Sequence, residues 1–297
     1  MRLSIITPTL NRAHFLEEAI ESVRAQDFPD YEHLIVDGGS TDGTLEMLAR
    51  HPHLRVVSEP DRGLYDALNK GLRMARGEIV GLLNSDDLQP AGTLAAVAGA
   101  FDDPAVELVS GGIEIFPAAE RTRTAVREAL MLTLENALFG QGAINARFFR
   151  RSLIERIGLF DLRYRIAADR EWLLRAALLG PRETWIERVF CRYREHDESM
   201  TFDRAKLNAA RYRQEHLAIA EEYLRKPEIV AATRRTLRRW HQRESVCEAQ
   251  QALLRGEFSA ALAHTRRGCR ISAGWPLAYV VDGSRGLAER MGLWKPS

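Results

Sequence analysis

A short apolar run that leads straight into two adjacent carboxylates constrains this chain more than any other stretch. Residues Ile79 to Leu83 are expected to form a buried strand, and the segment Asn84-Ser85-Asp86-Asp87 follows at once. In an open α/β sheet, ligands bind at the carboxyl ends of the strands. Neighbouring carboxylates repel each other unless a cation or hydrogen-bond donors offset their charge, and oxygen ligands suit Mg²⁺ or Mn²⁺ shared with substrate phosphates. The pattern predicts a metal and diphosphate site, with a plain Asx turn at Asp86 or Asp87 as the alternative.

Strand-like and helical patterns alternate from Leu3 to Ile115, which favours parallel strands joined by helices. Strands are expected at Leu3–Thr7, Leu34–Val36, Leu54–Val57, Ile79–Leu83 and Glu107–Ile115. Helices are expected after Asn11, from Thr44, over Leu64–Ala75 and over Pro90–Phe101. We therefore predict an α/β fold with a doubly wound, mostly parallel, Rossmann-like sheet.

The rest of the chain is less regular and then becomes helical and basic. Strands are expected at Ile144–Phe149 and Trp185–Tyr193, and helices over Ser152–Ile157 and Ala168–Leu179. Residues 205–297 carry 17 Lys and Arg against 9 Asp and Glu, whereas residues 1–204 carry 25 against 32. This uneven charge predicts two units: a catalytic domain of residues 1–204 and a basic helical C-terminal region of residues 205–297.

Cysteine content and hydropathy predict where the protein works. Its three cysteines, Cys191, Cys247 and Cys269, are far apart and have no metal-ligand spacing, which favours a reducing compartment without disulfides. No apolar run approaches the roughly 18–20 residues that a membrane span needs. The N-terminus passes directly into a strand and is too short for a signal peptide. We expect a cytoplasmic protein.

Several motifs stand in a fixed order along the chain. Those at the expected strand ends are Thr7-Pro8-Thr9-Leu10-Asn11-Arg12, Val36-Asp37-Gly38-Gly39-Ser40-Thr41-Asp42-Gly43-Thr44 and Asn84-Ser85-Asp86-Asp87. The others are Glu59–Gly71, Ala168–Arg175 and Tyr193–Thr201. Together they resemble the family-two glycosyltransferases with the GT-A fold, especially those that build bacterial surface polysaccharides, over roughly residues 3 to 202.

The resemblance implies transfer of a sugar from a nucleotide-diphosphate donor to a hydroxyl group, with inversion at the anomeric carbon. By this likeness Asp37 would hold the nucleobase, and Thr7, Pro8 and Asn11 would line the same nucleoside pocket. A helix N-cap or turn role is the alternative for Asp37.

The same likeness gives the acidic pair its roles. Asp86 would contact the ribose hydroxyls or the cation, and Asp87 would coordinate Mg²⁺ or Mn²⁺ directly. Such an ion neutralises the charge that grows on the leaving nucleoside diphosphate. Asn69 and Lys70 join the nucleotide-sugar set, although a solvated surface lysine is the alternative for Lys70.

The likeness makes Asp169 the general base that takes the proton of the acceptor hydroxyl. An acid that offsets the helix dipole is the alternative. Two departures from the family pattern bear on these roles. The family often has Glu-Asp where this chain has Ala168-Asp169, which leaves Glu171 as a second candidate base. It also often has Arg where this chain has Leu68, so a nucleobase-contacting Arg is missing and a UDP-sugar donor is less favoured.

His196 belongs to the motif Tyr193–Thr201, and we assign it to the metal or the diphosphate, with a structural histidine as the alternative. The basic C-terminal region groups Arg234, Arg235, Arg238 and Arg239 near Trp240. Such helices lie on anionic membrane surfaces, so one hypothesis places the protein peripherally at the inner face of the membrane, near a saccharide or lipid-linked saccharide acceptor. The alternative is a face packed on the catalytic domain or on another subunit of a homo-oligomer. No nucleic-acid recognition motif is present.

Three functions compete for this sequence. The first is the inverting, metal-dependent glycosyltransferase. The second is a catalytically silent sugar-nucleotide-binding assembly subunit with the same fold, against which Asp86, Asp87 and Asp169 count. The third is a nucleotidyltransferase, which would need a glycine-rich basic loop near the N-terminus, and the segment Thr7–Arg12 contains no glycine.

Overall fold

The structure is a computed structural model that describes residues 1–117, 123–125, 130–140, 142–196 and 207–271. The chain forms two compact units, Met1–Arg204 and Ala205–Ser297. Each is described by itself below.

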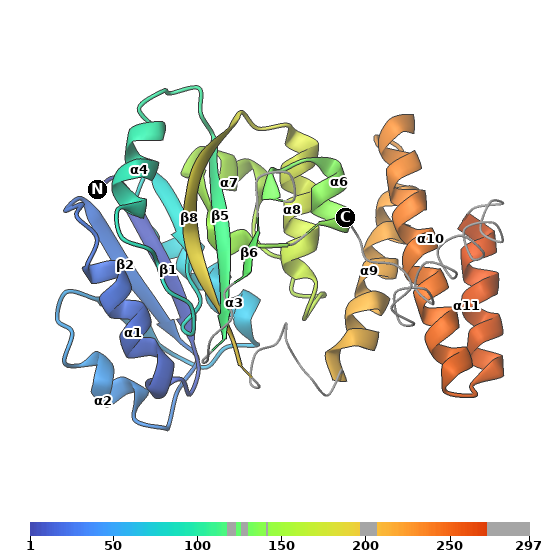
Figure 1. The fold of residues 1–297 in the computed structure, drawn as a ribbon, viewed down its shortest axis with the longest axis horizontal. Coiled ribbons are helices and arrows are strands. Elements are labelled where there is room, and N and C mark those ends of the chain that lie inside the picture. The colour runs from blue at the N-terminus through green and yellow to red at the C-terminus, as the bar shows by residue number, and fades with distance from the viewer. Residues whose placement is uncertain (118–122, 126–129, 141, 197–206, 272–297) are drawn as a thin grey trace. The chain divides into compact units, whose positions relative to one another are not determined.

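The described strands of the first unit form one sheet, in the order β3-β2-β1-β4-β7-β5-β6, with β8 paired to β5 (Figure 1). Their bounds are β1 Leu3–Thr9, β2 Tyr31–Asp37, β3 Arg55–Ser58, β4 Ile79–Leu82, β5 Leu108–Pro117, β6 Arg123–Ala125, β7 Arg147–Arg150 and β8 Glu183–Glu195. Strands β3, β2, β1 and β4 are parallel, as are β5 and β8. Strand β7 runs antiparallel between β4 and β5. The predicted α/β, mostly parallel sheet is confirmed.

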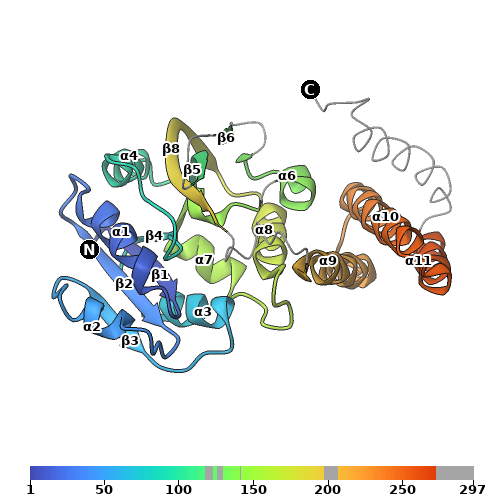
Figure 2. The same cartoon turned by 60° about the horizontal axis from the view of Figure 1, so that its bottom comes forward.

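Helices cover both faces of this sheet (Figure 2). Their bounds are α1 Ala13–Arg24, α2 Thr44–Leu48, α3 Leu64–Met74, α4 Thr93–Ala100, α6 Leu134–Phe139, α7 Arg151–Ile157 and α8 Ala168–Leu179. Ile5 of β1 shares a core with α1 and α4, whereas α3 packs on β1 and β2 from the other side. Phe160 joins α3 to α8, because its ring contacts Tyr65 and stacks on Trp172. The carboxyl ends of β3, β2, β1 and β4 lie along one edge of the sheet, because these strands are parallel.

Strand β7 is shorter than the sequence predicted. Residues Ile144–Ala146 form a 3-10 turn, and the strand starts only at Arg147. The side chain of Asn145 donates a hydrogen bond to Asp87 at 2.9 Å, which holds this stretch against the end of β4 instead of in the sheet ladder.

The buried side chain of His33 makes the stability of the first unit depend on pH. His33 of β2 is 2% exposed, its Nε2 lies 2.9 Å from Thr7 Oγ1, and burial lowers its pKa to about 3. Because the unfolded pKa is near 6.5, the stability is complete above that pH and is lost progressively as pH falls toward 3. Between pH 7 and pH 5 we expect the free energy of unfolding to drop by about 2 kcal/mol through this group.

Urea unfolding of the full chain at pH 7 and pH 5 checks this expectation. His33→Gln should reduce the drop, whereas His14→Gln, at an exposed position of α1, should leave it unchanged. An equal drop in wild type and His33→Gln would assign the effect to other groups.

The second unit is made of α9 Leu207–Arg225, α10 Ala231–Leu254 and α11 Phe258–Ile271, and α10 packs on both of the others. Trp240 and His241 of α10 are fully buried. Arg234 is not a free surface cation, because its guanidinium donates to backbone carbonyls around the end of α9. None of the described helices has the length and apolar character to cross a membrane. Trp275 and Trp294 lie outside the described residues.

Candidate active site

The acidic segment after β4 holds its two carboxylates in different environments. Asp87 is 1% exposed; its Oδ2 accepts from Asn84 Nδ2 at 3.2 Å and Asn145 Nδ2 at 2.9 Å, and its Oδ1 accepts from the backbone N–H of Arg194 at 3.0 Å. Burial, and then the neighbouring Asp86 carboxylate, raise the pKa of Asp87 well above its ordinary value. Asp87 therefore holds the segment after β4 to Asn145 and to Arg194 of β8.

Asp86 faces outward from the same segment. Its side chain is 21% exposed, and its Oδ2 lies 3.0 Å from His196 Nε2. The His196 ring packs on Phe15 of α1, with ring centroids 4.6 Å apart. Its Nδ1 is buried and has no hydrogen-bond partner among the described residues. The Asp86 carboxylate and the His196 imidazole thus meet at the carboxyl edge of the sheet, although they are far apart in sequence.

Strand β8 fixes this acidic segment from one side. Leu88 and Arg192 exchange two backbone hydrogen bonds, of 3.0 and 2.9 Å. Arg194 adds a bond from its Nε to the carbonyl of Asp86 at 3.0 Å and an ion pair with Glu18 of α1 at 2.6 Å. The acidic segment is thus held by the backbone of Arg192 and by the backbone and side chain of Arg194.

At the end of β1 the structure revises one predicted contact. Thr7 is buried and its hydroxyl pairs with His33, so this hydroxyl is not free to contact a nucleoside. Two residues further along, the Thr9 hydroxyl is buried without a hydrogen-bond partner among the described residues. Pro8 between them is buried in the strand. Thr9, which sequence reasoning overlooked, is the better candidate.

Asp37 is also engaged by the protein itself. Its carboxylate accepts hydrogen bonds from Gly39 N, from the backbone and hydroxyl of Ser40, and from Ser58 Oγ. Burial opposes ionisation, but these bonds outweigh it and lower the pKa of Asp37. The carboxylate is fully buried, so the turn role accounts for the contacts that the structure shows, and the nucleobase role stays a prediction.

Asn11 connects the loops that follow β1 and β2. Its side chain accepts from Thr41 N at 2.8 Å, and its own N–H donates to Ser40 Oγ at 2.7 Å. Its φ is +52°, a left-handed conformation that L-residues adopt at a cost and that is enriched at functional sites. Asn11 therefore shapes this part of the edge and is itself exposed there.

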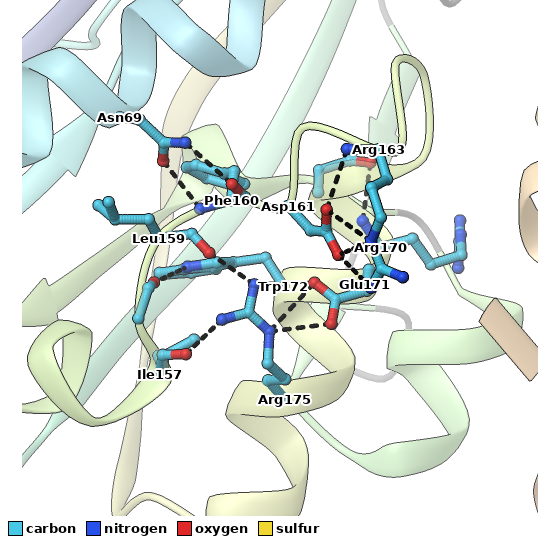
Figure 3. A network of polar contacts seen from close by, with 12 residues as sticks. Asn69, Ile157, Leu159, Phe160, Asp161, Arg163, Arg170, Glu171, Trp172 and Arg175 are labelled. Atoms are coloured by element: carbon cyan, nitrogen blue, oxygen red, sulfur yellow. Dashed lines mark hydrogen bonds and ion pairs between the residues drawn. The ribbon is translucent and has the colours of Figure 1, made fainter. Parts of the chain in front are cut away.

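The side chains of Asn69 and Lys70 both have partners within the protein. Asn69 is buried, and its amide exchanges hydrogen bonds of 2.9 and 2.8 Å with the backbone of Phe160 (Figure 3). Lys70 Nζ donates to the carbonyl of Pro60 at 2.8 Å and pairs with Glu59 at 2.9 Å. Asn69 thus bridges α3 to the segment before α8, and it is not carried into the nucleotide site.

Asp61, after β3, is a second residue that sequence reasoning overlooked. A Cβ at Gly38 would lie 2.5 Å from Asp61 Oδ2, so the acid fills the space that a side chain at position 38 would need. Its Oδ1 accepts from Gly63 N at 2.7 Å, while its Oδ2 makes no hydrogen bond to the described residues. One free carboxylate oxygen is thus available beside the β2 loop.

Asp169 lies in the first turn of α8, partly buried. Desolvation raises its pKa; the neighbouring Arg170, a hydrogen bond from the Arg170 N–H at 2.7 Å and one from Tyr65 reduce the rise without cancelling it. A Cβ at Gly142 would lie 3.3 Å from Asp169 Oδ2, so only a small residue fits over the carboxylate. A carboxylate with a raised pKa is a stronger base at neutral pH.

Glu171, the other candidate base, is fixed inside the protein. Both of its oxygens pair with Arg175 at 2.8–3.0 Å, and Arg175 also donates to the carbonyls of Ile157 and Leu159 (Figure 3). Glu171 is 4% exposed. This network anchors α8 to the preceding segment, whereas Asp169 takes no part in it.

Among the described residues, no group of three or more His, Cys, Asp and Glu gathers as a closed metal site. The pair formed by Asp86 and His196 is therefore the best candidate for a metal here. Oxygen and imidazole ligands suit Mn²⁺, and Mg²⁺ also keeps few protein ligands because it is shared with substrate phosphates. The chemistry of this donor set fits such an ion.

Comparison with known proteins gives a family match over the same region. The model of glycosyl transferase family 2 matches residues 4–163. An uncharacterised glycosyltransferase of Mycobacterium tuberculosis is 35% identical over 201 residues, covering 64% of this chain and 74% of its own. A PGL/p-HBAD biosynthesis glycosyltransferase of Mycobacterium bovis is 36% identical over 180 residues, covering 58% and 68%.

Solved structures share the fold. Residues 1–349 of S. aureus TarS, in complex with UDP-GlcNAc, match with a TM-score of 0.71 at 19% identity, over 100% of this chain and 93% of that one. The mannosyltransferase PcManGT of Pyrobaculum calidifontis, in complex with GDP-Man and Mn²⁺, matches with a TM-score of 0.62 at 26% identity, over 99% and 81%.

Proposed function

The chain belongs to glycosyl transferase family 2 and has the GT-A fold, and from this premise we propose that it transfers a sugar, with inversion, from a nucleoside-diphosphate donor to a hydroxyl group. The observation that carries the proposal is the contact between Asp86 and His196 at the carboxyl edge of the sheet. Such an edge is where open α/β sheets bind nucleotides, and the Asp86 side chain is partly exposed there.

Asp86 and His196 would hold Mn²⁺ or Mg²⁺ against the diphosphate. The ion would neutralise the charge that develops on the leaving nucleoside diphosphate. Asp87, which the family likeness assigned to the metal, would instead keep Asp86 in place; its hydrogen bonds with Asn84, Asn145 and Arg194 support this role. The Mn²⁺ in the PcManGT complex supports a divalent ion in this chain as well.

The nucleoside would lie against the loops after β1, β2 and β3. Pro8 and Thr9 would form one wall of its pocket, and Asn11 would bound it next to the Ser40 loop. The free oxygen of Asp61 would accept a hydrogen bond from a ring N–H or an amino group of the base. UDP-GlcNAc and GDP-Man in the two structural relatives support a nucleotide sugar as the donor class.

Asp169 would remove the proton from the acceptor hydroxyl as its oxygen attacks the anomeric carbon. Its raised pKa fits this role, and one base suffices because the leaving group departs as a metal-bound diphosphate. A single displacement of this kind inverts the anomeric centre. The pairing of Glu171 with Arg175 supports Asp169 over Glu171 as the base.

For the acceptor we propose a saccharide or a lipid-linked saccharide of surface polysaccharide or glycolipid biosynthesis. The printed function of the M. bovis relative, PGL/p-HBAD biosynthesis, supports this class. We further propose that residues 1–204 are the catalytic domain, that residues 205–297 are a separate helical domain, and that the enzyme works in the cytoplasm at the inner face of the membrane. A homo-oligomer stays a prediction.

Thermal unfolding with a panel of nucleoside diphosphates and their sugars tests the donor and the metal together. At a hundredfold excess over Kd, a ligand that binds only the folded state stabilises it by about 2.7 kcal/mol. We expect one nucleoside class to raise Tm in the presence of Mn²⁺ or Mg²⁺ and to lose most of this effect in EDTA. No shift with any nucleotide would contradict the proposal, and an equal shift in EDTA would contradict the metal.

A further inference from the structure

The second unit contains a small cavity that three arginines surround. It measures about 210 Å³ and is lined by Glu221, Leu224, Arg225, Arg238, Arg270 and Ile271. Arg225 ends α9, Arg238 lies in the first half of α10, and Arg270 lies in the last turn of α11. The three arginines of the lining therefore come from three different helices. The whole cavity lies within one unit.

The arginines of this cavity, which we call the arginine cavity, are poorly neutralised. Arg238 and Arg270 are exposed and have no ion pair or hydrogen bond with the described residues. Arg225 reaches only a long contact of 3.6 Å with Glu221. Unpaired arginines that line one cavity raise the local positive potential and so attract anions.

Glu221, the single acid of the lining, is already used elsewhere. Its Oε1 accepts from Arg267 Nε at 2.6 Å and lies 3.1 Å from His241 Nε2. Burial opposes ionisation of this carboxyl, but these two contacts outweigh it and lower its pKa. Its charge is thus matched by Arg267, so the arginine cavity keeps a net positive charge.

The size of the cavity restricts the ligand. It exceeds the space that one water molecule needs, and it is smaller than the roughly 300–1,000 Å³ of pockets that enclose drug-sized ligands. The volume suits a compact anion better than a whole nucleotide. Guanidinium groups bind phosphate oxygens with paired, charge-assisted hydrogen bonds, and Leu224 and Ile271 add an apolar wall that suits a phosphate ester.

We propose that Arg225, Arg238 and Arg270 form a binding site for a phosphate or diphosphate group in the C-terminal helical unit. The group is either borne by a lipid or belongs to a soluble phosphate compound. This site is independent of the proposed glycosyl transfer, since it involves neither Asp86 nor Asp169.

Calorimetric titration of the full chain with inorganic pyrophosphate tests the site, with EDTA present to suppress ion-bridged binding at the acidic segment. The double variant Arg238→Gln/Arg270→Gln removes two lining cations, and we expect it to weaken binding by at least about tenfold. The control, Arg235→Gln/Arg266→Gln, removes the same charge from exposed positions of the same two helices outside the lining, and should bind like wild type.

Sedimentation with phosphatidylglycerol vesicles, compared with phosphatidylcholine vesicles, separates the two sources. A lipid-borne phosphate predicts sedimentation that the Arg238→Gln/Arg270→Gln variant loses and the control keeps. A soluble source predicts that Arg238→Gln/Arg270→Gln loses pyrophosphate binding and the control keeps it, without sedimentation on the vesicles. The proposal is overturned if wild type binds neither probe, or if both double variants lose binding equally, because diffuse positive charge would then explain the result.

Discussion

Replacing Asp169 with asparagine is expected to slow the release of nucleoside diphosphate from the donor by about 10²–10⁴-fold, the usual cost of losing a positioned general base. The shape of the side chain is kept and only its basicity is lost. Donor affinity, measured by calorimetry, should stay the same because the base acts on the acceptor. Water serves as the acceptor in this assay.

The pH profile gives this prediction a second readout. Because burial raises the pKa of Asp169, the acidic limb of the wild-type rate should lie above the ordinary aspartate value of about 3.9. The rate falls as pH drops through this pKa, since protonation removes the base. In Asp169→Asn the limb should be absent.

Two control variants test the assignment of Asp169 as the base. Asp161→Asn changes another carboxylate just before α8, paired with Arg163, and should retain the wild-type rate (Figure 3). Glu171→Gln should lower Tm, because it weakens a buried ion pair, but folded protein should still turn over. A wild-type rate in Asp169→Asn, or an inactive but folded Glu171→Gln, would show that the base is misassigned.

Replacing Asp86 with asparagine is expected to reduce donor turnover by about 10²–10³-fold, comparable to losing one preorganised electrostatic contact in an active site. The dependence of nucleotide affinity on Mn²⁺ should fall with it, because only the imidazole of His196 would be left to hold the ion. His196→Ala should act in the same direction. Asp27→Asn, at an exposed position with no partner among the described residues, serves as the control.

Asp87→Asn separates the two neighbouring acids. An amide at this position keeps one accepting oxygen and places its NH₂ group against either the Arg194 N–H or the amides of Asn84 and Asn145, so we expect a stability loss of about 1–3 kcal/mol. Asp86→Asn should cost little stability, since Asp86 faces outward. Retained metal dependence in Asp86→Asn, with its loss in a fully stable Asp87→Asn, would restore Asp87 as the metal ligand.

The elements that local patterns specify were predicted well. Helix α8 spans Ala168–Leu179, as its apolar spacing predicts, and the carboxylates follow β4 as expected. The antiparallel insertion of β7 between β4 and β5 could not be read from the sequence, because strand direction depends on pairing between distant segments. The 3-10 turn at Asn145 likewise depends on Asp87, which is 58 residues away.

The family likeness placed Asp86 and His196 in one site, and the structure brings these two side chains into contact. Their roles, and that of Asp169, stay predictions. Whether a polar side chain is free depends instead on partners elsewhere in the chain. Thr7 is used by His33 and Asn69 by Phe160, and no local pattern reveals these pairings.

Nucleoside diphosphate release from a panel of nucleotide sugars, measured by chromatography with Mn²⁺ and with EDTA, tests the central claim most directly. The account predicts release from sugars of one nucleoside in wild type, only with the metal, and a loss of about 10²-fold or more in Asp86→Asn and Asp169→Asn. Tight nucleotide-sugar binding without release would point to a silent binding subunit, and release that is equal in EDTA and in both variants would contradict the account.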